Sequence, residues 1–205
     1  HLIWSDNLCC PGCQSVVTLW DACVSLNPAE ISSTFSCPKC DHKGPMDGAR
    51  RVTVQKRDDV LGDKRALRKR TLARVYGSTG KKCWSRPATA TDMALLKKIE
   101  AEPIPSSVPQ ALIPWGDLYR KGYHQGITHV HHFYTRRNLH ALAALRHAIV
   151  TVTEGRLREA LLFAFTACVN RASKRYQWNA KRPTNVMTGT LYVSSLRYEW
   201  NVWSL

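Results

Sequence analysis

Two Cys-x-x-Cys pairs near the start of the chain constrain its fold more than any other feature. They are Cys10–Cys13 and Cys37–Cys40, and a proline follows the first cysteine of each pair. Two residues between cysteines let a tight turn direct both thiolates at one ion, and four thiolates suit tetrahedral Zn²⁺. The 23 residues between the pairs contain a β-prone run, Val16–Trp20. The spacing therefore predicts a zinc ribbon, in which strands link two cysteine-bearing turns.

The sequence does not decide whether Cys9 or Cys10 is the first metal ligand, because the two are adjacent and either could act together with Cys13. The Cys10 register repeats the spacing of the second pair, so we expect the metal ligands to be Cys10, Cys13, Cys37 and Cys40. Two disulfides are the alternative to a metal, but nothing else in the sequence indicates secretion. A shell of four cysteines leaves no open coordination position, so the predicted Zn²⁺ is structural and not catalytic.

Positive charge is concentrated in the quarter of the chain that follows the cysteines. The formal net charge is +15, and residues 51–100 hold fourteen Lys and Arg against five Asp and Glu. Such a density favours a polyanionic partner, most commonly nucleic acid, although a solvated face or a flexible linker would carry the same charge. Tyr76 and Trp84 lie among the cations and favour nucleic acid, because aromatic rings stack on bases while cations contact phosphates.

Hydrophobic patterning predicts an α+β fold, with an N-terminal zinc ribbon and a β-rich basic region followed by a helical pair and C-terminal strands. The helical pair is expected over residues 135–150 and 156–170, with Gly155 as the break between them, and the strands over 190–194 and 198–204. We expect three parts, namely the zinc ribbon over 1–48, a basic β-rich target-recognition region over 49–102, and a linker, two helices and C-terminal strands over 103–205.

Local patterns within the basic region predict a strand, a hairpin and a helix. The strand covers residues 51–55, and the hairpin joins 71–76 to 81–86 through a four-residue turn. The segment between them, residues 56–70, is open between a loop and a helix. The predicted helix ends near Ala101. It would be capped by Thr91 or Asp92, with Ala94, Leu95 and Ile99 facing inward.

The histidine cluster His124–His132 holds four of the eight histidines. Clustered imidazoles invite a second metal site, but no acidic residue lies nearby in the sequence, so we expect packing and hydrogen bonding instead. Thr135 follows this cluster and is a candidate helix cap. The next two residues, Arg136 and Arg137, would be repelled by the positive end of the helix dipole. Either these arginines face an anion such as a phosphate, or their stems cover apolar surface while their charges reach water.

The stretch from Gly122 through Leu145, with its Tyr-Thr-Arg-Arg-Asn-Leu-His-Ala-Leu core, resembles a segment of bacterial adenine-specific DNA methyltransferases that contain a zinc ribbon. In that family a ribbon, a basic β-rich region and an aromatic-Thr-x-Arg-(Asn/Gln)-Leu helix follow one another. The same order is found here in Cys10–Cys40, Arg51–Arg86 and Phe133–Leu145. Residues 170–173, 178–179 and 199–203 are similar to the stretch that follows in the family.

Two motifs that the family needs for catalysis are missing from the chain. Its (Asp/Asn)-Pro-Pro-aromatic tetrapeptide holds the adenine amino group, and its Gly-x-Gly turn binds S-adenosylmethionine. The sequence contains neither a Pro-Pro dipeptide nor two glycines at that spacing. The resemblance therefore implies the middle section of a longer polypeptide. This section would carry no catalytic residues and be inactive alone, and S-adenosylmethionine would bind only to the parent protein.

The partners that this resemblance implies are double-stranded DNA and the remaining catalytic portion of the parent chain. No apolar run approaches the length of a membrane span, so we expect no membrane partner and a cytoplasmic protein. The alternatives are a stand-alone zinc-ribbon module that binds RNA or single-stranded DNA, and a scaffold for acidic protein partners. The predicted nucleic-acid contacts are Arg65, Arg68, Lys69, Arg70, Arg74, Lys81, Lys82, Trp84, Arg86, Arg136 and Arg137.

Overall fold

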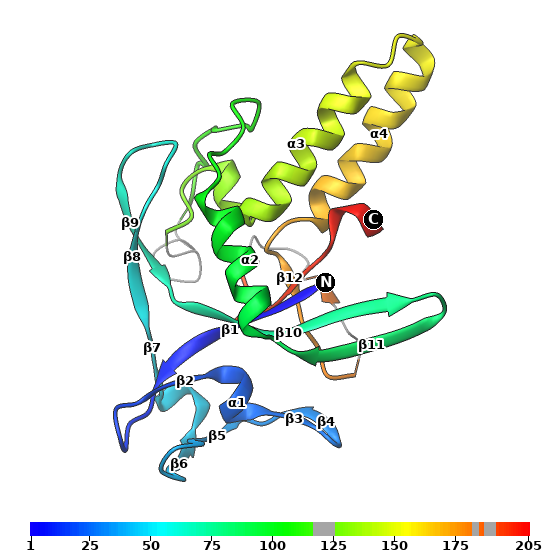
Figure 1. The fold of residues 1–205 in the computed structure, drawn as a ribbon. Coiled ribbons are helices and arrows are strands. Elements are labelled where there is room, and N and C mark those ends of the chain that lie inside the picture. Colours follow the sequence, from blue (N-terminus) through cyan, green and yellow to red (C-terminus); the bar gives the residue numbers. More distant parts are fainter. Residues whose placement is uncertain (117–125, 182–184, 187–191) are drawn as a thin grey trace.

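The structure is a computed structural model that describes residues 1–116, 126–181, 185–186 and 192–205. It confirms the mixed α+β class, with a β-rich N-terminal part that contains the four-cysteine cluster, followed by helices and C-terminal strands (Figure 1). His124, part of the predicted histidine cluster, lies outside the described residues.

Strand β1 (Leu2–Cys9) is the centre of the largest sheet among the described residues. All of its residues are buried except the half-buried Trp4. It pairs antiparallel with β10 (Arg70–Thr79) on one side and with β14 (Leu196–Glu199) on the other. One sheet thus joins strands from all three predicted parts of the chain. The other strands of this sheet are β2 (Val16–Thr18), β7 (Arg50–Arg51), β11 (Lys82–Pro87), β12 (Tyr176–Gln177) and β13 (Asn185–Val186).

The main core joins the cysteine-rich N-terminal part to the C-terminal strands. Trp20 on the short helix α1 (Leu19–Cys23) meets Trp178 edge to face, with ring centroids 4.7 Å apart. Ile3 and Leu8 of β1 are fully buried in the same cluster. An aromatic pair of this kind contributes about 0.5–1.5 kcal/mol beyond the apolar area that it buries. The N-terminal part therefore packs directly on distant sequence.

Three small two-stranded sheets complete the β structure. Two of them belong to the N-terminal part, which also contains the 3₁₀ turn η1 (Met46–Gly48). The third occupies the segment over 56–70 that was open between a loop and a helix, and this segment contributes to strands instead. The pairs are β3 (Val24–Leu26) with β4 (Ala29–Ile31), β5 (Thr34–Ser36) with β6 (Lys43–Pro45), and β8 (Thr53–Arg57) with β9 (Lys64–Arg68).

The hairpin predicted over 71–86 is confirmed as β10–β11, but its turn has two residues and not four, because the strands stay paired out to Thr79 and Lys82. The helix after it is α2 (Ala90–Ala101). The predicted cap of α2, Thr91 or Asp92, was wrong. Thr89 caps the helix and forms a capping box with Asp92, whose carboxylate also receives two hydrogen bonds from Arg86 at 2.5 and 2.8 Å. The predicted inward face was wrong for Leu95, which is 58% exposed, whereas Ala94 and the half-buried Ile99 line a cavity.

The predicted helical pair is confirmed as α3 (Arg136–Val150) and α4 (Gly155–Arg171), which project together from the sheet (Figure 1). Thr135 caps α3 as predicted. Gly155 begins α4 and does not lie outside it, because the Glu154 carboxylate accepts hydrogen bonds from the first N–H groups of that helix. None of the helices in the described ranges has the length and the apolar composition that a bilayer crossing requires.

The C-terminal strand is shorter than the predicted 198–204. β14 ends at Glu199, which faces Leu2, the first residue of β1, and the chain then enters the 3₁₀ turn η4 (Val202–Ser204). The strand ends there because β1 offers no further strand residue to pair with. Of the strand predicted over 190–194, residues 190–191 lie outside the described residues, and residues 192–194 belong to no strand. The short 3₁₀ turn η3 (Val130–Phe133) precedes α3.

Candidate metal centre and the basic residues around the sheet

The sulfur atoms of the two Cys-x-x-Cys pairs converge at one point. The Sγ atoms of Cys10, Cys13, Cys37 and Cys40 all lie within 4.8 Å of one another. The Cys10–Cys40 and Cys13–Cys37 sulfurs are 3.7 and 3.8 Å apart, far beyond the roughly 2.05 Å of a disulfide bond, and all four cysteines are free. The predicted cluster is thus confirmed as a group that could hold a metal ion.

The two cysteine-bearing turns have the same backbone geometry. In each, the N–H of the first cysteine donates to the carbonyl five residues later at 2.9 Å, and its own carbonyl accepts from the N–H four residues later at 3.0 Å. Gln14 and Asp41, four residues after Cys10 and Cys37, both adopt a left-handed backbone with φ of 57° and 56°. The strand pairs β1–β2 and β5–β6 lead into and out of these turns. Local sequence therefore builds two equivalent turns that each present two thiols.

Cys9 does not belong to the cluster, which settles the register left open by the sequence. It is the last residue of β1, and its Sγ donates to the backbone oxygen of Gln14 at 3.5 Å and to the side-chain oxygen at 3.3 Å. Adjacent residues at the end of a strand point to opposite sides, so only one of Cys9 and Cys10 can face the other sulfurs.

The thiols of the cluster have unequal acidity. Hydrogen bonds from Ser15 lower the pKa of Cys13 to about 6. The backbone N–H of His42 favours the thiolate of Cys40, but the neighbouring thiols outweigh this effect and raise the pKa of Cys40 to about 12. Binding of a metal needs all four groups as thiolates, so binding must release protons and weaken in acid.

We expect the chain to carry about one metal ion and Cys37→Ser to lose most of it, because three thiolates hold such an ion poorly. The substitution should also lower the melting temperature by about 10 °C or more, since several kcal/mol of metal-binding energy is lost. Elemental analysis and thermal unfolding measure both effects. Cys83→Ser, at an exposed thiol outside the cluster, is the matched control. An unchanged melting profile with retained metal in Cys37→Ser would contradict the assignment.

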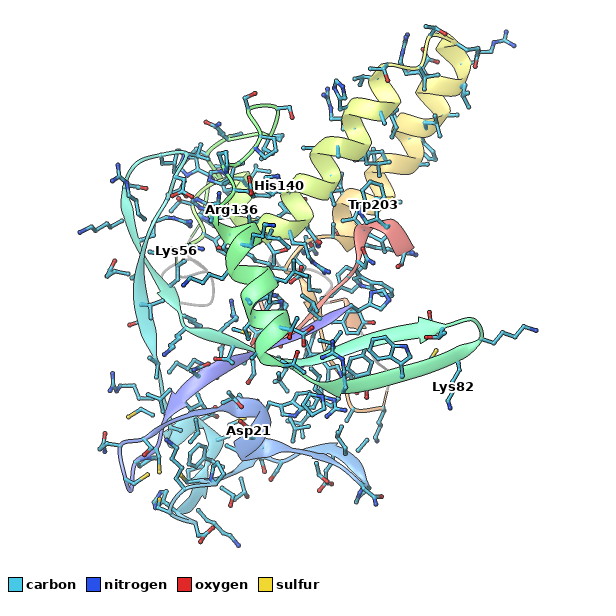
Figure 2. The ribbon with its side chains drawn as sticks, viewed as in Figure 1. Asp21, Lys56, Lys82, Arg136, His140 and Trp203 are labelled. Carbon is cyan, nitrogen blue, oxygen red and sulfur yellow. The ribbon has the colours of Figure 1, made fainter. Side chains whose placement is uncertain are left out.

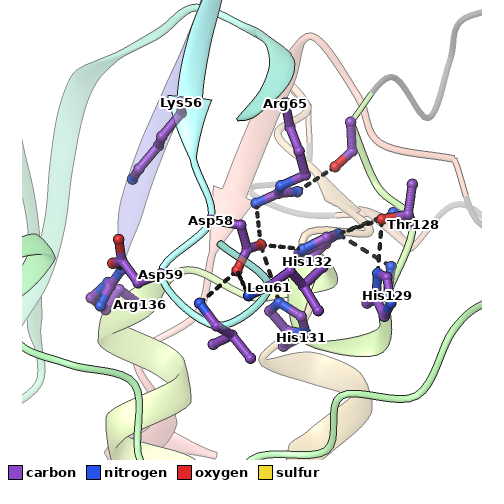
Figure 3. A network of polar contacts seen from close by, with 12 residues as sticks. Lys56, Asp58, Asp59, Leu61, Arg65, Thr128, His129, His131, His132 and Arg136 are labelled. Atoms are coloured by element: carbon purple, nitrogen blue, oxygen red, sulfur yellow. Dashed lines mark hydrogen bonds and ion pairs between the residues drawn. The ribbon is translucent and has the colours of Figure 1, made fainter. Parts of the chain in front are cut away.

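A second cluster joins Asp58 in the β8–β9 turn to the histidine-rich segment (Figure 3). The Oδ2 atom of Asp58 lies 2.6 Å from Nε2 of His132, 3.3 Å from Nε2 of His131, and 2.9 Å from Nη2 of Arg65. Its Oδ1 atom accepts the N–H groups of Val60 and Leu61. The expectation that no acidic residue accompanies the histidines was therefore wrong, because the fold supplies one from 74 residues away.

The hydrogen-bond partners of His132 favour an ion-pair cluster over a metal site. Nδ1 of His132 lies 3.0 Å from the backbone nitrogen of Thr128 and 3.2 Å from that of His129. Both N–H groups donate to Nδ1, so the proton of the neutral ring is on Nε2, which donates to Asp58. A neutral histidine binds a metal through its unprotonated nitrogen. In His132 that nitrogen faces the backbone, although the three side chains are close enough to surround an ion.

Burial keeps His132 neutral, whereas hydrogen bonds keep Asp58 ionised. Burial, followed by the charge of Arg65, lowers the pKa of His132 to about 3. Burial alone would raise the pKa of Asp58, but hydrogen bonds from Leu61, Val60 and His132 more than offset it and hold the pKa well below its usual range. A neutral histidine therefore donates to an ionised carboxylate at neutral pH.

Acid should destabilise this cluster. Between pH 6.5 and 3 the unfolded state protonates His132 and the folded state does not, so the free energy of unfolding should fall by up to about 1.4 kcal/mol per pH unit. Because acid also weakens a thiolate metal site, the quantity to compare is the slope in variants. Denaturant unfolding from pH 7 to 4 should give a shallower slope for His132→Gln. The exposed His147→Gln should keep the wild-type slope, and equal slopes in both variants would contradict the expectation.

Five of the predicted nucleic-acid contacts line one cavity of about 780 Å³ and form ion pairs there. Each of their guanidinium groups contacts a protein carboxylate, so the anion expected at the start of α3 is supplied by the protein itself. The pairs are Arg65 with Asp58, Arg68 and Arg70 with Asp6, Arg136 with Asp59, and Arg137 with Glu199. Lys69 lies exposed at the rim of the same cavity.

The other predicted contacts belong to the β10–β11 hairpin. Arg86 is paired with Asp92, as described above, and Arg74 donates to Ser85 and lies 6.0 Å from the ring of Trp20. Lys81 and Lys82 are exposed at the turn, and Figure 2 shows Lys82 at the far end of the hairpin. Trp84 is 40% exposed and covers Gly77, where a Cβ atom would lie 2.3 Å from its ring. Among the predicted contacts that the structure describes, the exposed lysines Lys69, Lys81 and Lys82 thus form no ion pair with a carboxylate, and two of these three lie at the hairpin tip.

Sequence reasoning missed the carboxylates that pair with these arginines, the half-buried Lys174 and the buried Arg197. One signal was present in β1, where Ser5, Asp6 and Asn7 interrupt an apolar strand. Three consecutive polar residues cannot all point to solvent from a strand that alternates faces, so at least one must be buried and paired.

Comparison of the chain with profiles of protein families, with curated proteins and with solved structures found no match in any of the three. The resemblance to zinc-ribbon adenine methyltransferases therefore stays a prediction that rests on the order of the sequence motifs.

Proposed function

We propose that this chain is the DNA-binding and target-recognition section of an adenine-specific (N6) DNA methyltransferase, with a structural Zn²⁺ in its four-cysteine cluster. The observation that carries the DNA-binding part is the β10–β11 hairpin tip, where Lys81 and Lys82 extend from the sheet without a carboxylate partner among the described residues (Figures 1 and 2). The methyltransferase part rests on the motif order in the sequence and on the two motifs that the chain lacks.

The geometry of the sulfur cluster supports zinc as its metal. A tetrahedral site with zinc–sulfur bonds of about 2.3 Å has sulfur–sulfur edges of about 3.8 Å. The Cys10–Cys40 and Cys13–Cys37 edges, 3.7 and 3.8 Å, agree with that size. With four cysteines the shell is complete, so the ion would stabilise the N-terminal part and perform no reaction.

The hairpin suits contact with the phosphate backbone. Its strands form a long antiparallel ribbon, with Cα pairs from Arg74 and Pro87 out to Thr79 and Lys82. Two adjacent lysines at its tip neutralise phosphates without any cost of breaking an ion pair, and Trp84 offers a partly exposed ring beside them. An enzyme that modifies adenine must extrude the base from the duplex, and a grip on the flanking backbone helps to offset that cost.

Reversing the charges of the hairpin tip should weaken DNA binding. For Lys81→Glu/Lys82→Glu we expect at least tenfold weaker binding to duplex DNA and a decrease of about 2 in the slope of log K against log salt, because two phosphate contacts are lost. Fluorescence anisotropy at several salt concentrations measures both. Arg86 is left in place because its replacement would break the cap of α2.

The matched control is Arg146→Glu/Arg156→Glu, which makes the same change in net charge at exposed positions near the outer end of the helical pair. It should retain most of the affinity. Equal losses in both double variants would mean that net charge alone drives binding and would contradict a hairpin contact. Preference for single strands over duplex DNA in the wild type would favour the alternative of a stand-alone zinc-ribbon module.

The methyltransferase assignment predicts how the chain responds to the methyl donor. We expect no binding of S-adenosylmethionine to the chain alone, because the Gly-x-Gly turn is missing. Isothermal titration calorimetry tests this, with a longer chain that supplies the Pro-Pro and Gly-x-Gly motifs as the positive control. Clear binding to the chain alone, or none to a longer chain with both motifs, would contradict the assignment.

A further inference from the structure

The cavity beside the central sheet has a strong excess of positive charge. Among the described residues, eleven Lys and Arg but only four Asp and Glu line its volume of about 780 Å³. Each of the four acids already contacts a cation, since Glu100 pairs with Lys56 in addition to the pairs of Asp58, Asp59 and Glu199 described above. Of the seven remaining cations, Arg68 and Arg70 pair with Asp6, and the other five form no ion pair with a carboxylate of the described residues.

Arg197 is the most deeply buried of these remaining cations. It lies on β14 beside Trp4 of β1, and its guanidinium carbon is 5.3 Å from the centre of the Trp4 ring. The residue is 4% exposed, and its buried Nε–H has no hydrogen-bond acceptor in the described part of the chain. A buried N–H group without an acceptor is costly unless an anion or ordered water completes its hydrogen bond.

Lys174 adds a second positive charge to the same wall. Its Nζ donates to the backbone oxygen of His132 at 2.7 Å, which occupies one of its three N–H groups. Removal from water, followed by the charges of Arg197 and Arg70, holds the pKa of Lys174 well below its usual range. Burial and Arg70 likewise lower the pKa of Arg197. An anion between these groups would offset the cost of holding the like charges together.

The rest of the cavity wall suits a ligand larger than a single ion. Leu96 and Ile99 of α2, Ile104 after it and Tyr134 before α3 contribute apolar and aromatic surface. The volume falls within the roughly 300–1,000 Å³ of small-molecule sites, which combine apolar walls with a few polar anchors. A phosphate on a flat, partly apolar base and sugar matches both the charged and the apolar parts of this cavity.

We propose that the cavity is a nucleotide-binding site in which Arg197 and Lys174 bind the phosphate group. The bound group belongs either to a free mononucleotide or to a nucleotide within a nucleic-acid strand. The proposed site is separate from the lysines of the β10–β11 tip, and it does not require the chain to be part of a methyltransferase.

The test uses the full chain with its metal bound and compares adenosine 5′-monophosphate, adenosine and inorganic phosphate by calorimetry. We expect the mononucleotide to bind at least tenfold more tightly than adenosine, because only the former presents a phosphate to the cations. Arg197→Gln should weaken binding of the mononucleotide by about 10- to 100-fold, the range expected for loss of a charged hydrogen bond. Arg146→Gln, at an exposed arginine outside the cavity, should bind like the wild type.

A five-nucleotide single strand identifies the source of the phosphate, and this arm uses the Lys81→Glu/Lys82→Glu background so that the hairpin tip does not contribute. Strand binding that depends on Arg197, with no binding of the mononucleotide, would assign the site to a nucleic-acid chain. If Arg197→Gln does not fold, Lys174→Gln keeps a donor toward His132, removes the charge and should weaken binding at least tenfold. Three outcomes would overturn the proposal. They are equal affinity for the mononucleotide and adenosine, binding that neither Arg197→Gln nor Lys174→Gln weakens, and no binding of the mononucleotide or of the five-nucleotide strand.

Discussion

The fold depends on a carboxylate buried inside its central strand. Asp6 lies in β1 with no exposed surface, and three arginines from three other strands surround it: Arg70 at 2.7 Å, Arg68 at 3.4 Å and Arg51 at 3.5 Å. An isolated buried carboxylate would cost several kcal/mol, and removal of its partners would leave that cost uncompensated. The requirement to satisfy Asp6 therefore ties β7, β9 and β10 to one point on β1.

The cations discussed above lie in three different settings of the described structure. Arginines near the sheet neutralise Asp6, Asp58, Asp59 and Glu199 inside the molecule, so their charges hold elements together. Lysines at the hairpin tip remain exposed and are free to meet a polyanion. The fourteen Lys and Arg of residues 51–100 thus overstate the cations that this region leaves unpaired, because several of its arginines form internal ion pairs. The cavity beside Arg197 forms a third setting, in which buried cations outnumber the acids around them.

The N-terminal part obeys a different constraint. Its strands are only three residues long, apart from β1, and its small sheets contain two strands each. Such sheets are marginally stable by themselves. A metal held by the two cysteine turns would join β1–β2 to β5–β6, and the contact of Trp20 with Trp178 joins the same part to the distant C-terminal strands. Long-range packing therefore stabilises this part, and a metal in the four-cysteine cluster would add to that stability.

Local sequence was enough to predict the cysteine turns, the β10–β11 hairpin and the α3–α4 pair. Each depends on spacing within a few residues or on helical periodicity, and no distant partner is needed to form it. The pairing of β1 with β10 and β14 and the meeting of Asp58 with His132 could not be predicted, because they join residues more than 60 positions apart. The same limit applies to the arginines, because the sequence shows that each is a cation but not which carboxylate pairs with it. Whether a cation faces a protein anion or solvent is decided only when the chain closes on itself, since an ion pair requires two atoms within about 4 Å.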